Sequence, residues 1–181
     1  AGSDVFLGAG VETVSRVDGD ISTTIIRTPK GDLTRQVRRT TVTSATVKFP
    51  LEGLDDVDKF LSIPYVPPAV APAPFHALKA RAGEEALVMV GIGDAICLPA
   101  SWFSPEGFCL AWADAPDLVE QLTAVAADRI NARVDALCRA GVDAFRIVGG
   151  EYASVQLGPE GFDALVMPFD TELVDLMHRH D

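Results

Sequence analysis

Short runs of β-prone residues, separated by turn residues, fill the beginning of the chain. In the stretch GDISTTIIRTPKGDLTRQVRR, two runs rich in Thr, Ile and Val flank the tetrapeptide Pro-Lys-Gly-Asp. Proline and glycine between two β-prone runs are typical of a hairpin. Residues 41–49 continue the pattern, so we expect one more strand there. The pattern therefore predicts a β-hairpin-rich segment over residues 1–50.

Helical spacing of apolar residues follows. In EGLDDVDKFL, residues 52–61, the apolar positions recur on one face of a helix. Residues 65–74 are rich in proline, which favours an extended linker over a helix or strand. A short helix is expected at residues 73–82.

The second half of the chain contains short, continuous apolar runs. ALVMVGI at residues 86–92 and FRIV at residues 145–148 are typical of strands buried on both faces. Helical patterns follow each run, and this alternation predicts βα units with a parallel sheet. We expect two adjacent parallel strands, near residues 86–92 and 143–149, joined by a right-handed crossover.

Two helices accompany these strands. The clearer one covers residues 117–138, within a predicted helix near 115–140, where apolar residues form one stripe. Asp114 is expected to cap its start, and Gly141 to take the left-handed conformation after its end. The second helix is expected near residues 159–178, interrupted or kinked at Pro168.

Charge and composition narrow the function classes. The 181-residue chain fits a single domain, and no run of 18 or more apolar residues suggests a membrane span. A net charge of −11 argues against nucleic acid as a partner. The basic cluster at residues 35–39 is interpreted as a solvated strand face. Three cysteines without metal-ligand spacing indicate free thiols in a reducing cytoplasm, and no signal peptide is visible.

The candidate functional residues lie where the predicted parallel strands end. Gly149 and Gly150 let the backbone turn sharply, and Glu151 and Tyr152 then stand at the rim where α/β proteins carry their sites. Glu151 either has a functional role at this rim or only caps the following turn.

Asp94 follows the earlier strand in the same way, either as an acid–base partner or as a cap. Trp102 and Phe103 either line the binding site of a flat ligand or belong to the core.

A succession of motifs resembles the uroporphyrinogen decarboxylase superfamily. They are RTPKGDL, EGLDDVDKFL, GIGDAICLPASWF, WADAPDLVEQL, AGVDAFRIVGGEYA and LGPEGFDALVMPFDTELVDLMHRH. The resemblance covers nearly the whole chain and implies a (β/α)₈ barrel with its site at the C-terminal face. That superfamily contains the decarboxylases of porphyrin synthesis and the corrinoid-dependent methyltransferases.

Departures from the decarboxylase pattern favour the methyltransferase-like branch. The decarboxylases carry an Asp-Ser pair where this chain has Gly149 and Gly150, and a substrate-binding Tyr close to the position of Trp102. RTPKGDL and GGEY look like the methyltransferases. The resemblance thus implies methyl transfer between a corrinoid and a thiol or a methylated substrate. Uroporphyrinogen decarboxylation and a non-catalytic remnant stay open as alternatives.

The length predicts an incomplete barrel, since a full one needs about 250 residues. We expect residues 1–181 to form one domain, with βα units over 84–181. Their positions at the strand ends predict catalytic roles for Glu151 and Asp94, and substrate binding by Tyr152 and Gly150. The resemblance adds substrate binding by Trp102.

Expected partners follow from the same reasoning. No cofactor or metal is expected on this chain alone, and Zn²⁺ with a corrinoid partner belongs to a full-length methyltransferase. His178 and His180 are interpreted as helix-end charges. We expect a tetrapyrrole or corrinoid partner, no nucleic acid and no membrane. The chain alone is expected to be inactive and to self-associate through open sheet edges, or to pair with a missing barrel half.

Overall fold

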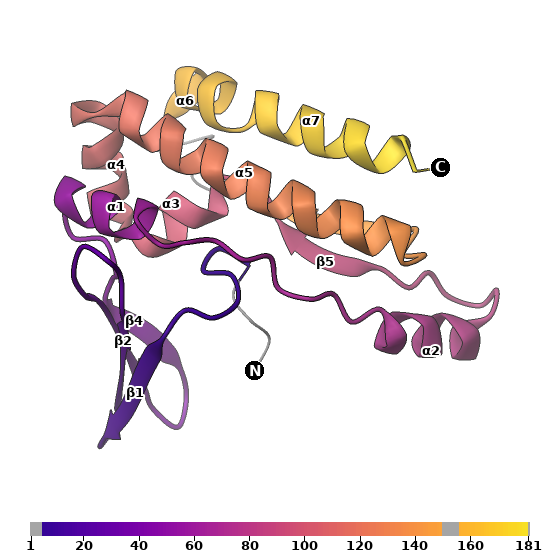
Figure 1. Ribbon diagram of the computed structural model, residues 1–181, viewed down its shortest axis with the longest axis horizontal. Helices are drawn as coiled ribbons and strands as arrows, with labels where there is room; N and C mark the ends of the chain where they lie inside the picture. The colour runs from indigo at the N-terminus through magenta and orange to yellow at the C-terminus, as the bar shows by residue number, and fades with distance from the viewer. Residues whose placement is uncertain (1–4, 150–155, 181) are drawn as a thin grey trace.

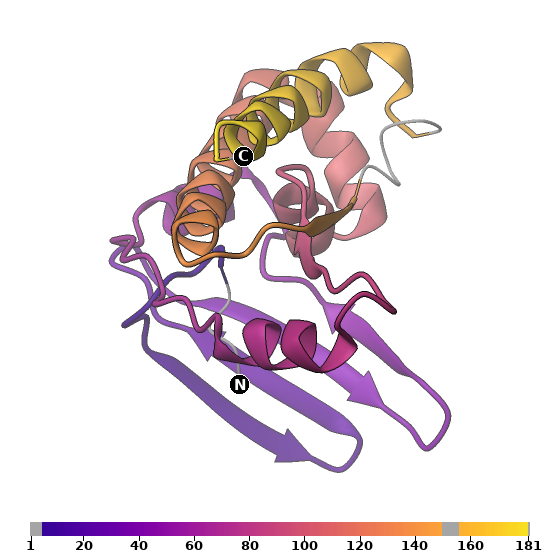
Figure 2. The same ribbon diagram turned by 90° about the vertical axis from the view of Figure 1, so that its right-hand side faces the viewer.

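A computed structural model describes residues 5–149 and 156–180. Figure 1 shows an antiparallel sheet at one end, helices α1, α3 and α4 above it, and helices α5 and α7 running side by side over a second, small sheet. Turning the view by 90° shows α2 apart from the other helices (Figure 2).

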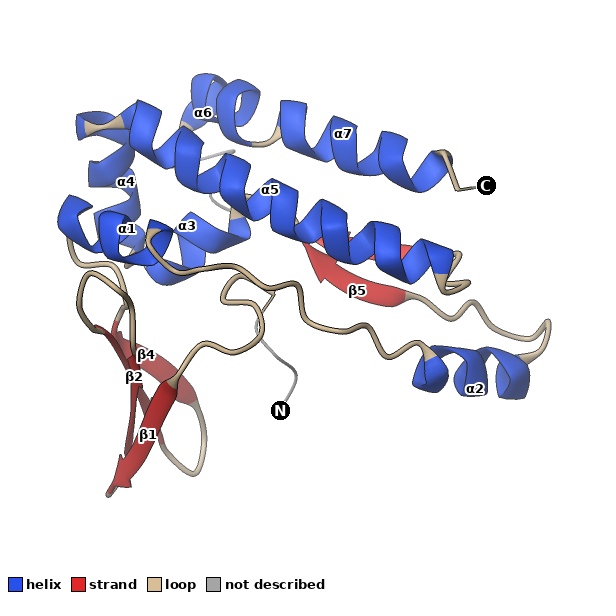
Figure 3. Cartoon of the chain, viewed as in Figure 1, coloured by secondary structure: helices blue, strands red, loops and turns tan. Residues whose placement is uncertain are grey.

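Strands make up two separate sheets in the described ranges, as the colouring of Figure 3 shows. They are β1 (Thr13–Asp18), β2 (Ile21–Ile26), β3 (Leu33–Arg39), β4 (Ser44–Lys48), β5 (Val90–Gly93) and β6 (Phe145–Val148).

Seven helices follow the first four strands within the described residues, most of them in the second half of the chain. They are α1 (Leu54–Leu61), α2 (Ala73–Ala82), α3 (Cys97–Trp102), α4 (Pro105–Asp114), α5 (Pro116–Arg139), α6 (Gly158–Leu165) and α7 (Met167–His178).

The N-terminal strands form a four-stranded antiparallel meander in the order β1-β2-β3-β4. The predicted hairpin is confirmed: β2 and β3 pair from Ile26↔Leu33 to Ile21↔Arg38 around the Pro-Lys-Gly-Asp turn. Ile26 and Leu33 are buried at the end of the sheet next to the helices. The remainder of the sheet extends away from the core.

The two predicted βα strands are confirmed as adjacent and parallel. β5 pairs with β6 from Val90↔Phe145 to Gly93↔Val148. The ladder is shorter than the apolar run, since residues 86–89 precede the strand. Both strands therefore end at the same edge, next to Asp94 and Gly149.

Helix α5 matches the predicted apolar stripe, with Leu122, Ala126, Ile130 and Val134 buried along one face. The predicted cap by Asp114 is wrong. Asp114 is the last residue of α4, and Ala115, which precedes α5, offers no side-chain hydrogen bond.

Glycine and proline mark the helix ends. Gly141 has φ of +83°, as predicted for the residue that follows α5. Pro168 lies in the first turn of α7, where the absence of its N–H costs nothing, so the helical segment is split into α6 and α7.

The prediction of an incomplete (β/α)₈ barrel is wrong for the described residues. A barrel closes by parallel pairing, whereas four of the strands form an antiparallel meander and only β5 and β6 pair in parallel. The reason lies in the first half of the sequence. Short turns can join antiparallel neighbours only, and parallel neighbours need a long crossover.

The largest apolar cluster joins the inner end of the antiparallel sheet to α1, α3, α4 and α5. Phe60, Leu98, Phe108 and Leu122 are fully buried within it. Smaller clusters join α2 to the end of α5 and α5 to α7. Among the described residues, none of the helices has both the length and the apolar composition needed to cross a membrane.

Candidate functional site

Two glycines at adjacent strand ends make room for two titratable side chains. A Cβ atom placed on Gly149 would lie 2.0 Å from Oδ1 and 2.1 Å from Oδ2 of Asp94. A Cβ atom on Gly93 would lie 3.1 Å from Sγ of Cys97. The carboxyl group therefore occupies the space that any side chain at position 149 would need. Sequence reasoning had given Gly149 the role of a sharp backbone turn.

Asp94 is buried, with 2% of its surface exposed. Its Oδ1 atom has no hydrogen-bond partner within the described ranges. Burial raises the pKa of this carboxyl group, and hydrogen bonds from Cys97 partly oppose the rise. A buried carboxyl group in such a place favours the protonated form more than an exposed one does.

Cys97 begins helix α3 and lies against the end of β6. Its Sγ atom donates a hydrogen bond to the Val148 carbonyl oxygen at 3.5 Å. Burial, and then the negative charge of Asp94, raise the pKa of this thiol to about 12. Cys97 is therefore a neutral thiol near neutral pH and a poor nucleophile.

Asp170, in the first turn of α7, is the second acid of the site. Burial, and then the charge on Asp94, raise its pKa to about 6. Because the ionisation of one carboxyl group disfavours that of the other, the pair retains a proton to a higher pH than two exposed acids would. The arrangement suits proton transfer.

A cavity of about 240 Å³ runs along β5 and reaches Cys97. Its lining residues include Gly91, Gly93, Phe6, Ile130 and Arg133. Ligand pockets usually measure about 300–1,000 Å³. The cavity is therefore sized for part of a large ligand or for a small one.

The residues that sequence reasoning singled out have different placements. Asp94 lies at the strand edge where it was expected. Gly150, Glu151 and Tyr152 fall outside the described residues. Trp102 is 5% exposed and packs edge-on against Phe60, with ring centroids 4.8 Å apart, so its indole belongs to the core.

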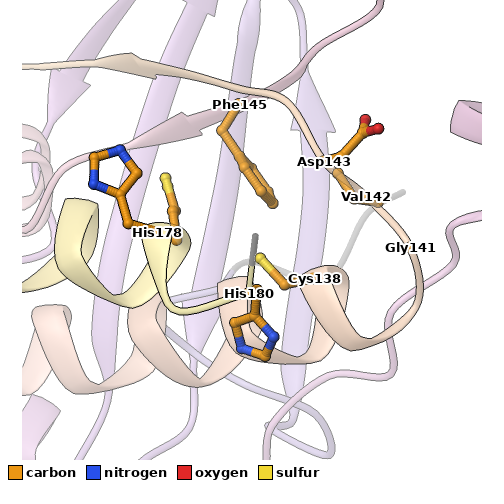
Figure 4. Close-up of a pocket in the computed structure, with 8 residues that line it drawn as sticks. Cys138, Gly141, Val142, Asp143, Phe145, His178 and His180 are labelled. Atoms are coloured by element: carbon orange, nitrogen blue, oxygen red, sulfur yellow. The ribbon is translucent and has the colours of Figure 1, made fainter.

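A second cavity, of about 500 Å³, lies at the opposite end of the small sheet, where β6 begins and where α5 and α7 end (Figure 4). Cys138, Phe145, His178 and His180 are among its lining residues, and the two imidazole rings point in different directions. Nε2 of His180 lies 2.9 Å from Oδ1 of Asp135 on α5, so this ring joins the two helices.

The zinc centre that the resemblance implies has no counterpart in the described ranges. No three His, Cys, Asp or Glu side chains there are grouped closely enough to hold a metal ion. The three cysteines all lie in those ranges and form no disulfide.

Sequence reasoning missed Asp170, Cys97 and the role of Gly149 as the space for Asp94. Asp170 carries no local pattern, because its burial depends on how α7 packs. The glycines at the ends of both strands did offer a sequence pattern from which close packing at this site could have been predicted.

Comparison with protein-family models, curated proteins and solved structures found no match.

Proposed function

We propose that this chain belongs to the uroporphyrinogen decarboxylase superfamily, in its corrinoid-dependent methyltransferase-like branch, and that Asp94 and Asp170 supply protons at its site. The motifs RTPKGDL and GGEY support the branch. The observation that supports this site assignment is the buried Asp94 carboxyl group, which fills the side-chain space of Gly149.

Proton supply is the contribution that these residues can make to methyl transfer. When a methyl group leaves oxygen, nitrogen or sulfur, the electron pair of the broken bond stays on that heteroatom. A proton delivered to the same atom makes it a better leaving group. A carboxyl pair in which Asp170 titrates at about pH 6 and the pKa of Asp94 is raised retains a proton for this step under mildly acidic to neutral conditions.

Decarboxylation of tetrapyrrole acetate side chains is the second candidate. The neutral Cys97 thiol, with its pKa of about 12, favours it, because this reaction needs acids and no thiolate. Loss of CO₂ leaves an electron pair on carbon, and a carboxyl group donates the proton that replaces it. The compartment proposed for either activity is the cytoplasm, where free thiols persist.

Ligand binding by the 181-residue chain separates the two candidates. Hydroxocobalamin and uroporphyrin can each be titrated against the intrinsic fluorescence of Trp102 and Trp112. Corrinoid side chains are amides, whereas uroporphyrin carries carboxylates. Ionisation of Asp170 therefore repels uroporphyrin, and its affinity should fall as the pH rises through about 6, while corrinoid affinity changes little.

We expect the corrinoid to bind. Asp170→Arg, which places a long cation across the site, should weaken binding at least about tenfold. Asp114→Arg, at an exposed position on α4, is the matched control and should leave the affinity unchanged. Binding of uroporphyrin alone, with the stated pH dependence, would favour decarboxylation. Binding of neither ligand, or equal effects of the two arginine variants, contradicts the proposed site.

A further inference from the structure

Strand β1 forms one edge of the antiparallel sheet and is exposed along its whole length. All six of its residues are exposed, and β2 is its only neighbour in the sheet order of the described residues. Val17 is 74% exposed and Val14 is 44% exposed. An edge strand offers a row of unpaired N–H and C=O groups to another strand.

The opposite edge of the same sheet is protected. The pairing of β4 with β3 is interrupted by a register shift at Gln36/Val37, and Lys48 lies at the end of the strand. Bulges and lysines are devices that prevent edge-to-edge pairing. β1, in contrast, pairs with β2 through six consecutive residues without a shift. Only one of the two edges is therefore ready to accept a strand.

We propose that β1 pairs with β1 of a second copy of this chain, antiparallel, across a two-fold axis at Val17. The outcome is a symmetric dimer in which the two four-stranded sheets become one continuous sheet. This proposal does not depend on the proposed function, since neither Asp94 nor Asp170 lies near β1 in the chain or in the sheet.

The turn between β1 and β2 determines which backbone groups are free. Asp18 and Ile21 are the closing pair around Gly19, whose φ of +58° fits a two-residue hairpin turn. A closing pair exchanges its hydrogen bonds within the hairpin, so the next residue, Val17, directs its N–H and C=O to the free edge. Ser15 does the same two residues earlier. Two copies can pair only with these outward residues opposite each other.

Charge favours an axis at Val17 over an axis at either of the two preceding residues. With the axis at Val17, each Arg16 lies opposite Asp18 of the other copy, which gives two opposite-charge pairs. With the axis at Arg16, two arginines would face each other. With the axis at Ser15, Glu12 would face Asp18. Opposite charges on facing residues stabilise a strand pair and like charges destabilise it.

The local charge of β1 also suits a second copy. Arg16 and Asp18 make the strand neutral, although residues 13–48 as a whole carry seven Lys or Arg and three Asp, a net +4. The remainder of the chain then holds eight Lys or Arg and 23 Asp or Glu, a net −15. The excess positive charge lies on β3, β4 and the β2–β3 turn, away from the β1 edge. A strand pair alone buries less than a standard interface, so we expect a reversible dimer in the micromolar range.

Sedimentation equilibrium of the 181-residue chain over a concentration series tests the proposal. Arg16→Asp turns both cross-pairs into like-charge pairs and should weaken dimerisation about tenfold. Asp18→Arg should act in the same way. The double variant Arg16→Asp/Asp18→Arg restores opposite charges in the same register and should regain the dissociation constant of the parent chain.

Backbone pairing is tested by Val17→Pro. Its missing N–H is the one that faces the free edge, so the β1–β2 ladder keeps its hydrogen bonds while the dimer loses two. We expect a monomer with unchanged circular dichroism. Val42→Ala, at a valine that is 92% exposed in the β3–β4 turn, is the control and should dimerise normally.

A chain that stays monomeric at about 100 μM, far above the expected dissociation constant, overturns the proposal. A dimer that is insensitive to Val17→Pro, or a double charge variant no better than the single ones, also overturns it, because the interface would then lie elsewhere. If Val17→Pro perturbs folding, the charge series on exposed side chains decides alone.

Discussion

Asp170→Asn should change the pH dependence of stability in a defined direction. The folded protein holds the pKa of Asp170 at about 6, against an ordinary value of 3.8 for an exposed aspartate. Between these values the folded state binds more protons than the unfolded state, so the free energy of unfolding falls as the pH rises. The stability linked to this proton is fully present below about pH 4 and is lost by about pH 7. Asparagine imitates the protonated form at every pH and removes the loss.

The expected gain can be worked out from the pKa difference. A difference of about two units corresponds to ~3 kcal/mol at most, and partial solvent screening at this half-buried position reduces it to ~1–2 kcal/mol. The carboxylate also interacts favourably with the N-terminus of α7, which is worth about 0.5 kcal/mol and is lost in the variant. Asp170→Asn should thus be more stable than the parent chain by about 1 kcal/mol near pH 7, and equal to it near pH 4.

Urea denaturation between pH 4 and pH 8, followed by circular dichroism, measures this difference directly. Asp175→Asn, at an exposed position on the same helix, is the control and should keep the parent pH dependence. Asp94→Asn adds a second check, since it removes the lesser cause of the shift and should lower the pKa of Asp170 only partly. Parallel stability curves for the parent chain and Asp170→Asn, or a variant less stable at pH 7, would refute the reasoning.

Three further variants or reactions test the described contacts. Gly149→Ala should destabilise the fold by about 1–3 kcal/mol, because its Cβ meets the Asp94 carboxyl group, and a double variant with Asp94→Ala should cost less than the sum of the two single changes. Cys97 should react with iodoacetamide at pH 8 far more slowly in the folded chain than in urea, as peptide mass spectrometry would show; equal rates would contradict its raised pKa of about 12. Arg129→Met should destabilise by about 2–4 kcal/mol in thermal unfolding, since the guanidinium group is buried between the rings of Phe60 and Tyr65 and donates to the Phe6 carbonyl oxygen; a loss below ~0.5 kcal/mol would contradict this.

Local chemistry determined the elements that sequence reasoning found. The β2–β3 hairpin needed only two β-prone runs and the turn between them, and α2 and α5 needed only a helical pattern with its proline or glycine limits. The parallel pairing of β5 with β6 also followed, because two apolar runs separated by a long helix have few other ways to become buried.

Elements α3 and α4 escaped prediction because prolines interrupt their sequence. Pro99 and Pro105 each lie in the first turn of a helix, where proline is tolerated. The sequence did contain a usable start for α4. Ser104 caps it, with its Oγ accepting a hydrogen bond from the Gly107 N–H at 3.0 Å, and Pro105 follows at once. The barrel prediction failed for another reason: it rested on the order of motifs, and order alone does not determine strand direction.

The pair formed by Asp94 and Gly149 shows why a candidate site is harder to predict than an element. Glycine at a strand end suggests an open approach for a ligand, and taken alone Gly149 supports that view. In the fold, the parallel ladder places Gly149 beside Asp94, because Gly93 and Val148 are the last paired residues. The Asp94 carboxyl group then fills the space where a side chain of residue 149 would lie, and it is buried away from solvent. Gly149 therefore makes room for a buried acid instead of a ligand, and this outcome depends on strand register, which neither residue encodes locally. The acid, rather than the opening, is therefore what the ends of these two strands provide for chemistry.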